Sequence, residues 1–489
     1  MNSMRVLVIG LDGATWDLLK PWADEGVLPT IKWLMENGCW GKLESTVPPV
    51  TFPAWKCYST GKNPGKLGVY WWVYPDFKSK TLKINDSRSF KSLELWDYIG
   101  RCNKVCGVIG MPTTYPPRKI NGFMVTEFNP SDSGYTYPKE VETELKKIGF
   151  KGEFVDYHGK NKEEVFNYSI EAIKERFKAA RYLAKKYNPD FMHLTIFHID
   201  AIQHFFWEDM VNKDPDFGDA IERAWRLIDT EIKFLLDAVN PNYVLLVSDH
   251  GFTRLKAMFN IYQWAIKKGY LVLNSRWIAV LNKLGVLGLC SILVKRFLKF
   301  ISSNREGITR AISTSLIDWD RSKIIPLSEG PIYVNPNSIK SSNQYLEFIT
   351  QLISELSEIT DPKTGEKLTR AVYKKDEIYK GEYLHLAPDI IILLNSGYEI
   401  TAGFSYNKEW NYKPKERGWS GIHDLFGIFL AYGKGIKKGV RIDKAKIYDI
   451  APTILHILGL PIPNDMDGRV LMEIFEEDSE FSRQPVYVD

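Results

Sequence analysis

Short apolar runs alternate along this chain with longer segments whose apolar residues recur at helical spacing. The runs that have the length and composition of buried strands span residues 5–11, 104–110, 191–197, 243–249, 389–394 and 425–433. Residues 162–187 are typical of the helical stretches, because charged residues fill the positions between the apolar ones. Apolar strands separated by helices form a parallel sheet that is covered on both faces. We therefore predict an α/β fold with a mainly parallel sheet and helices on both faces.

Length and composition narrow the class of protein. The chain has 489 residues, and a prior of about 150 residues per domain favours two or three folding units. Its 64 basic and 60 acidic residues nearly balance, which argues against a nucleic-acid partner. The five scattered cysteines fit a reducing compartment better than a disulfide framework. Because the first apolar run starts at Arg5 and leaves no room for a signal peptide, we expect a cytoplasmic protein.

The segment 254–326 interrupts the alternation, since it is basic, helical in pattern and poor in core strands. We predict that it forms an inserted helical cap and that residues 1–253 and 327–489 form the core. Within it, residues 276–301 carry five basic and no acidic side chains, and only 284–294 is free of charge. That stretch is well short of the roughly 20 residues that a spanning helix needs. A helix packed on the rest of the protein is the favoured interpretation, and peripheral contact with a membrane surface is the alternative.

Carboxylate and imidazole side chains stand at the ends of several predicted strands. The residues concerned are Asp12, Asp200, His204, Asp249, His250 and His423. If a helix opens near residue 200, Asp200 and His204 share one face of it. Each residue alone has a structural explanation, such as a turn residue for Asp12 or a helix N-cap for Asp200. Together they predict a divalent metal centre, because imidazole and carboxylate are ligands of zinc and related ions.

A candidate nucleophile lies in the stretch STVPPVTFPAWKCYSTG (45–61). Thr51 precedes Phe-Pro-Ala-Trp, and proline is favourable in the first turn of a helix, so we expect a helix to begin there. The backbone N–H groups at a helix start attract anions. Thr51 is therefore either the attacking group or only the cap of this helix.

The order of these residues resembles that of the type I phosphodiesterase/nucleotide pyrophosphatase family, in the alkaline phosphatase superfamily. The flanking stretches GLDGATWD, VTFPAW, TGKNPGKLGV, DAIQH, SDHGF and YDIAPTILHILGLPIPNDMDGRVL agree with it. The resemblance covers nearly the whole chain and is weakest in 254–326. It implies an alkaline phosphatase-like core and a metal-dependent hydrolase that cleaves phosphodiester or pyrophosphate bonds in small phosphate esters.

The resemblance also implies how the site is divided. One metal ion would be held by Asp12, Asp249 and His250 and bridged to Thr51, and a second by Asp200, His204 and His423. Both ions are expected to be zinc, with manganese as the alternative. The metals would activate Thr51, which would become transiently phosphorylated. Hydrolysis would then remove the phosphoryl group from Thr51.

One departure from the family concerns the stretch VYWWVYPD (69–76), where nucleotide pyrophosphatases commonly carry an asparagine that helps to bind a phosphate oxygen. We predict that Trp72 contacts the organic part of the substrate, the alternative being that this aromatic run packs in the core. A phosphonoacetate hydrolase-like enzyme or a phosphomonoesterase of the same superfamily is the alternative function. From another class, the alternative is a non-catalytic binding or membrane-surface protein, against which the intact ligand set argues.

Overall fold

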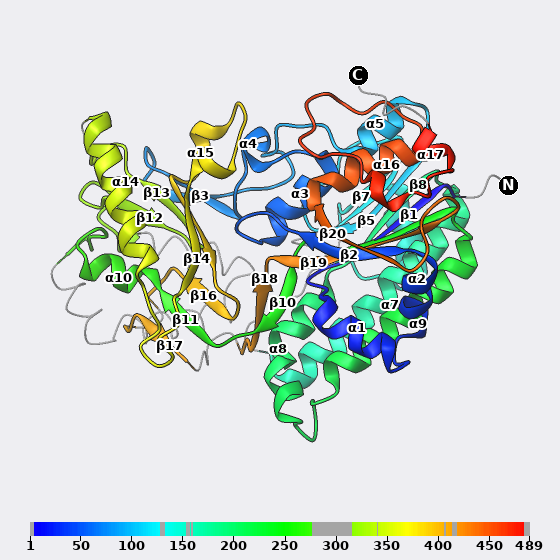
Figure 1. The fold of residues 1–489 in the computed structure, drawn as a ribbon, viewed down its shortest axis with the longest axis horizontal. Coiled ribbons are helices and arrows are strands. Elements are labelled where there is room, and N and C mark those ends of the chain that lie inside the picture. The colour runs from blue at the N-terminus through cyan, green and yellow to red at the C-terminus, as the bar shows by residue number, and fades with distance from the viewer. Residues whose placement is uncertain are drawn as a thin grey trace. The chain divides into compact units, whose positions relative to one another are not determined.

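The computed structural model describes residues 4–127, 133–152, 157, 160–275, 315–339, 341–404, 407–412 and 418–483. The chain divides into two compact units, whose helices and strands are labelled in Figure 1. The first unit consists of Met1–Leu67, Asp86–Arg254 and Glu416–Asp489. The second consists of Gly68–Asn85 and Leu255–Lys415.

The first unit is built on a mostly parallel sheet. Within the described residues the sheet has nine strands, in the order β20–β2–β19–β9–β1–β8–β5–β6–β7 (Figure 1). They are β1 (Val6–Leu11), β2 (Cys39–Glu44), β5 (Cys106–Met111), β6 (Gly122–Thr126), β7 (Thr136–Tyr137), β8 (Phe191–Ile196), β9 (Tyr243–Val247), β19 (Phe426–Gly433) and β20 (Val440–Lys446). β19 is antiparallel to β2 and β9, and β7 to β6, whereas the other pairs are parallel. The predicted α/β fold is confirmed.

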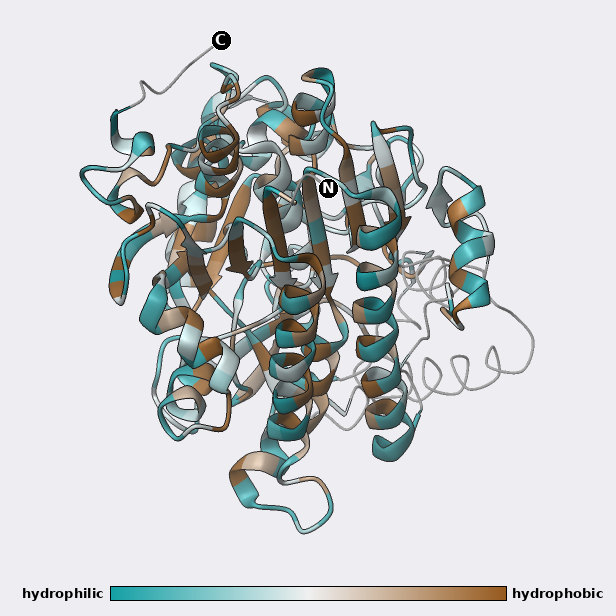
Figure 2. Cartoon of the chain, turned by 90° about the vertical axis from the view of Figure 1, so that its right-hand side faces the viewer, coloured by the Kyte–Doolittle hydropathy of each residue, from teal (hydrophilic) through white to brown (hydrophobic). Residues whose placement is uncertain are grey.

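Helices cover both faces of this sheet (Figure 1). One face carries α1 (Trp16–Asp24), α2 (Pro29–Asn37), α7 (Lys162–Tyr187), α8 (His198–Asn212) and α9 (Ala220–Val239), and the other carries α3 (Thr51–Thr60), α5 (Leu95–Arg101) and α16 (Ile450–Leu458). Side chains alternate along β1, so Leu7 and Ile9 enter the core shared with the first group while Gly10 lies against Trp55 of α3. Figure 2 shows the apolar strands behind helices banded in both colours, the pattern of amphipathic helices on a buried sheet.

The shorter elements of the first unit connect these layers. They are α4 (Pro64–Leu67), α6 (Glu140–Lys147), α17 (Glu480–Arg483) and the antiparallel pair β10 (Gly251–Arg254) and β18 (Gly421–Asp424).

Gly61 caps the carboxyl end of α3, and its carbonyl accepts the backbone N–H of Asp467 at 2.8 Å. The backbone and side-chain nitrogens of Asn63 both donate to the Asp467 carboxylate at 2.8 Å. The stretches TGKNPGK and NDMDG therefore bind each other and fix the carboxyl end of α3.

The second unit has sheets and a core of its own. β12 (Ile324–Pro326), β13 (Pro331–Val334), β15 (Ile390–Leu394) and β14 (Thr369–Lys374) form one sheet, and β16 (Tyr398–Thr401), β11 (Ala257–Asn260) and β17 (Trp410–Asn411) form another. β3 (Val73–Asp76) and β4 (Thr81–Ile84) form a hairpin, and the helices described are α10 (Ile261–Lys267), α14 (Ser342–Ser357) and α15 (Lys375–Ile378). The run 389–394, expected in the main sheet, is β15 and pairs antiparallel here, because an apolar run does not specify its partner strand.

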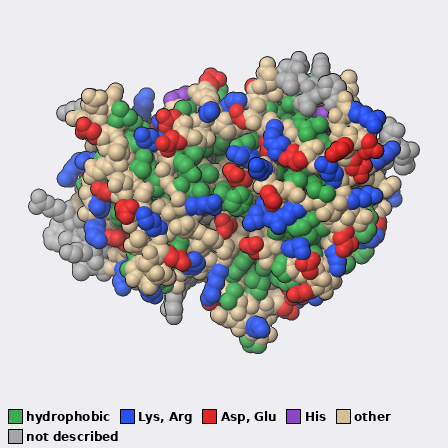
Figure 3. All heavy atoms as spheres, viewed as in Figure 1, with side chains coloured by type: hydrophobic (Ala, Val, Ile, Leu, Met, Phe, Trp, Pro, Cys, Tyr) green, Lys and Arg blue, Asp and Glu red, His purple; other side chains and the backbone are tan. Residues whose placement is uncertain are grey.

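The observed division differs from the boundary expected at residue 326. Residues 327–415 and 68–85 belong to the second unit, since their strands pair within this unit and line separate apolar clusters. Residues 276–314 of the predicted cap lie outside the described residues, so the cap and its membrane contact stay predictions. In the described part of the chain, no helix combines the length and apolarity needed to cross a membrane. Figure 3 shows acidic and basic side chains interspersed over one face of the molecule.

Candidate metal centre

Three neighbouring strands deliver candidate ligands to one edge of the central sheet. β1 pairs in parallel with β8 on one side and with β9 on the other, so their carboxyl ends meet at this edge. Asp12 follows β1, Asp200 lies just after β8, and Asp249 and His250 follow β9. β19 is antiparallel to β9, so its amino end, which His423 precedes, reaches the same edge. Residues far apart in sequence are thereby brought together.

Asp200 and His204 come from the first turns of α8. The helix begins at His198 with Phe197 in the cap position, so Asp200 is not an N-cap residue. The two side chains share a buried face, as predicted, and His204 Nε2 lies 3.4 Å from Asp200 Oδ2.

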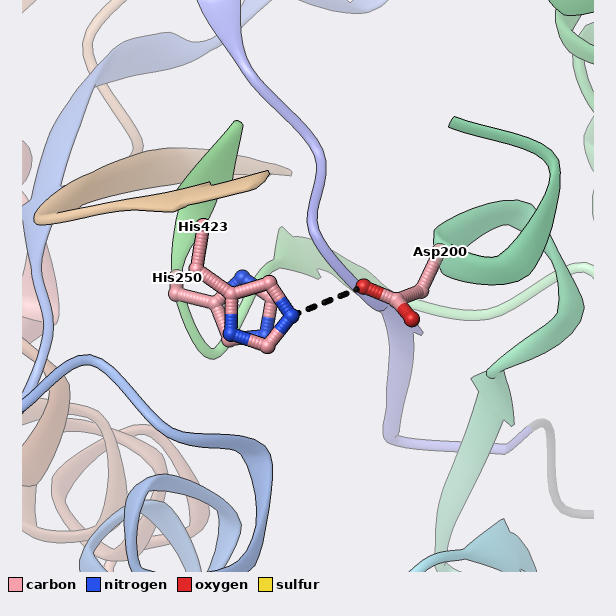
Figure 4. A group of neighbouring side chains, drawn as sticks. All are labelled: Asp200, His250 and His423. Atoms are coloured by element: carbon pink, nitrogen blue, oxygen red, sulfur yellow. Dashed lines mark ion pairs between the residues drawn. The ribbon is translucent and has the colours of Figure 1, made fainter. Parts of the chain in front are cut away.

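His250 and His423 are held side by side by a short antiparallel pair of strands. In that pair Phe252, two residues after His250, is opposite His423. The two imidazole rings stack with their centroids 3.6 Å apart, and Figure 4 shows both rings next to Asp200. His423 Nε2 lies 3.3 Å from Asp200 Oδ1. His250 Nε2 lies 3.1 Å from Asp249 Oδ2 and 3.6 Å from Asp12 Oδ1.

Backbone carbonyls fix the protonation of the three imidazoles. Each Nδ1 lies within hydrogen-bonding distance of a carbonyl oxygen: His204 of Gly421 at 2.8 Å, His250 of Gly251 at 3.0 Å and His423 of Pro49 at 3.1 Å. Because a carbonyl only accepts, each Nδ1 carries the proton and each Nε2 presents a lone pair to the centre. Nevertheless the Nε2 atoms of His204 and His423 are only 3.1 Å apart.

The carboxylates present further acceptors to the same place. Asp12 Oδ1, Asp200 Oδ1 and Asp249 Oδ2 accept no hydrogen bond from the described residues, although each lies within 3.6 Å of an imidazole Nε2. The other oxygens of Asp12 and Asp249 are held by Trp55 Nε1 at 2.9 Å and by the backbone N–H of Gly13 at 3.2 Å. The three carboxylates are at most 5% exposed. Buried acceptors that face one another without protons between them fit a bound cation.

Burial and mutual repulsion shift the pKa values of these groups. Burial, followed by the charges of Asp249 and Asp200, raises the pKa of Asp12 well above its usual range. Burial and the charge of Asp200 raise the pKa of Asp249 to about 7. Burial lowers the pKa of His250 well below its usual value, which fits a neutral ligand.

The described ligand atoms form two overlapping groups. Asp12, Asp249 and His250 form one, and Asp200, His250 and His423 form the other. His204 stands beside the second group, next to His423 Nε2. The sequence-based division placed His250 in the first group only. In the structure His250 belongs to both groups, because its ring stacks on that of His423.

Thr51 points its hydroxyl at this centre. α3 begins at Thr51, but Val50 occupies the cap position and no side chain caps the helix. Thr51 Oγ1 lies 3.1 Å from His250 Nε2 and the residue is 3% exposed. Since Nε2 carries a lone pair, the hydroxyl donates to it. The interpretation of Thr51 as only a helix cap is therefore not supported.

Two tryptophans that the sequence analysis did not single out contact the candidate ligands. Trp55 donates to Asp12, and Trp419 stacks on His204 with ring centroids 3.9 Å apart. Trp55 could have been found from its spacing, because it lies four residues after Thr51 on the same helix face. The stretch around Trp419 carries no comparable local signal, because its contact with His204 bridges distant parts of the chain.

Two further histidines and Trp72 are not among the candidate ligands. His198, next to Asp200, is buried, contacts the rings of Tyr168 and Phe197, and has no hydrogen-bond partner for either ring nitrogen among the residues described. His158 lies outside the described residues. Trp72 belongs to the second unit, where it is half-buried against the apolar cluster of Val73.

Comparison with known proteins assigns the family. The sequence profile of the type I phosphodiesterase / nucleotide pyrophosphatase family matches residues 6–423, a range that contains every candidate ligand. The chain belongs to this family. Membership indicates a hydrolase of phosphodiester or pyrophosphate bonds.

A solved structure of human ectonucleotide pyrophosphatase/phosphodiesterase 5 is similar over 96% of this chain and 98% of that chain, with 15% identity and a TM-score of 0.49. A comparison with curated proteins finds no match.

In the metal-free protein we expect the free energy of unfolding to fall as the pH rises from about 6 to about 8. The pKa of Asp249 is about 7 in the folded chain against an ordinary value of 3.8. The folded chain therefore holds this proton more tightly, and the stability that it contributes is lost as the pH rises through about 7. The loss is on the order of 1 kcal/mol. Thermal unfolding of EDTA-treated protein measures it, and Asp249→Asn should show a smaller pH dependence; equal dependence in both proteins would contradict the assignment.

Proposed function

We propose that this chain is a two-metal phosphohydrolase with a threonine nucleophile. Asp12, Asp249 and His250 hold one divalent ion, Asp200, His204 and His423 hold the other, and Thr51 attacks the phosphorus. The main support is the arrangement of imidazole lone pairs and carboxylate oxygens that accept no hydrogen bond around one buried centre. A mixed nitrogen and oxygen ligand set suits zinc, with manganese as the alternative.

The bound ions would supply positive charge that favours the alkoxide form of Thr51 and neutralises the phosphoryl oxygens. Thr51 Oγ1 lies 3.1 Å from His250 Nε2, the atom whose lone pair would go to the ion, so the hydroxyl is placed next to that ion. Its attack on phosphorus breaks the bond to the leaving-group oxygen and forms phospho-Thr51, which water then hydrolyses. The transferred phosphoryl group meets the amino end of α3, where backbone N–H groups favour an anion.

Metal content tests the ligand assignment. Zinc-loaded protein should contain about two divalent ions per chain, because the ligands divide three and three. Chelation should abolish the hydrolysis of bis-p-nitrophenyl phosphate, and zinc should restore it. Asp249→Asn and Asp200→Asn should each lose mainly one of the two ions, as measured by elemental analysis after desalting. A fully active preparation without metal would refute the proposal.

The role of Thr51 is tested by a pair of substitutions. Thr51→Ala should reduce turnover to background while metal content stays near the parental value, because Thr51 is not needed to hold either ion. Thr51→Ser keeps a hydroxyl at the same place and should retain part of the activity. Steady-state hydrolysis and elemental analysis of the three proteins provide the measurement. If Thr51→Ala hydrolyses diesters at the parental rate, Thr51 has only a structural role.

The aromatic run at 69–76 bears on the substrate. Tyr70 is buried in the second unit and donates its hydroxyl to the carbonyl of Tyr383 at 2.7 Å, so it is a packing residue. Trp72 is half-buried. A phosphomonoester dianion brings an extra charge and an extra oxygen that need donors, whereas a diester does not. These features support a diester or pyrophosphate substrate with an organic group that an indole can contact.

We expect a higher kcat/KM for bis-p-nitrophenyl phosphate than for p-nitrophenyl phosphate at fixed zinc and pH. Trp72→Ala should lower the diester value selectively, because a ring contact with the organic group would be lost. Trp33→Ala is the control, since Trp33 is an exposed tryptophan on α2 of the first unit. A monoester preferred tenfold or more would overturn the diesterase assignment and leave the two-metal chemistry in place.

A further inference from the structure

Helix α3 contacts the candidate ligand set at a second point besides Thr51. Thr51 and Trp55 are four residues apart and share a helix face. Thr51 Oγ1 lies 3.1 Å from His250 Nε2, and Trp55 Nε1 donates to Asp12 Oδ2 at 2.9 Å. His250 and Asp12 belong to the same group of candidate ligands, together with Asp249. The helix that carries the proposed nucleophile is thus bound to that group twice.

The indole of Trp55 selects which oxygen of Asp12 faces the centre. Oδ2 accepts the indole N–H, whereas Oδ1 accepts no hydrogen bond from the described residues and lies 3.6 Å from His250 Nε2. Trp55 and Asp12 are both 0% exposed, so solvent does not supply a substitute donor. Without the indole N–H, this buried carboxylate would lose its hydrogen bond from Trp55 and the restraint on its rotation.

The indole itself is held in place by its surroundings. Its ring packs edge-on against Tyr58 and His193, with centroids 5.5 and 5.7 Å away. His193 is fixed in turn by the hydroxyls of Tyr58 at 2.8 Å and Thr195 at 2.7 Å. Strand β1 makes room for the ring at Gly10, where a Cβ atom would lie 2.5 Å from it. Trp55 is therefore a preformed donor.

We infer that Trp55 is a positioning residue that fixes Asp12 for the ion held by Asp12, Asp249 and His250, and so couples this ion to the helix that bears Thr51. The inference rests on the proposed metal site. A hydrogen bond to the outer atom of a ligand orients that ligand, and its removal typically weakens metal binding by roughly 10- to 100-fold. A tryptophan that only filled space would need no donor at this point.

The test is the zinc affinity of the purified full-length chain, measured by competition with a chromophoric chelator. In Trp55→Phe one of the two zinc ions should bind roughly 10- to 100-fold more weakly, while the other keeps its affinity. Trp96→Phe is the matched control. Trp96 is also 0% exposed, and its indole nitrogen has no hydrogen-bond partner within the described chain, so this variant loses the same volume without losing a contact to a ligand. It should bind zinc like the parent.

Replacement of Trp55 by benzothienylalanine keeps the shape of the ring and removes only the N–H group, so it decides the question even if Trp55→Phe does not fold. Circular dichroism of the metal-free proteins verifies folding. Weakened binding of one ion in this protein supports the inference. Parental zinc affinity in the folded benzothienylalanine protein overturns it and leaves the proposed function intact. A parent chain that binds no zinc overturns both.

Discussion

The lone pairs of imidazole nitrogens and carboxylate oxygens face one another at the edge of the central sheet. Three imidazole Nε2 atoms and three carboxylate oxygens lie close together, each imidazole having its proton committed to a backbone carbonyl on its other side. Such an arrangement is repulsive unless a positive charge lies among the acceptors, because burial removes the water that would otherwise screen them. These atoms are brought together by the order of β1, β8, β9 and β19 in the sheet and by the turns at the ends of these strands.

Helix α3 has little freedom to move, because it is buried and held at both ends. All of its residues are buried, including Lys56, whose ammonium group pairs with Glu94 at 2.5 Å. Burial lowers the pKa of Lys56, so the pair with Glu94 is what keeps a charge tolerable inside the first unit. The carboxyl end of the helix is tied to Asp467, and its amino end contacts His250. Thr51, the proposed nucleophile, is thus positioned by the core and not by a surface loop.

Much of this candidate site could be predicted from the sequence, because its candidate ligands follow local rules. Asp12 and Asp249 were found as polar residues at the ends of apolar strands, and Asp200 with His204 by helical spacing. The sharing of His250 between two ligand groups could not be predicted, because it depends on a ring stacked across two distant segments. The second unit was underestimated for a similar reason. The apolar run at 389–394 has the composition of a core strand, and only its partners reveal that it belongs to a separate sheet.

The division into two units separates the candidate ligands from the aromatic run at 69–76, which departs from the family pattern. Every proposed ligand and Thr51 lie in the first unit, whereas the aromatic run that includes Trp72 lies in the second. The candidate ligands are constrained because their acceptor atoms face one another at about 3 Å. A change at one of these residues therefore disturbs the others. Residues 68–85 bear no such constraint, since their strands pair within their own unit. Under the proposed function, a change at Trp72 would alter substrate preference without altering the candidate ligands or Thr51.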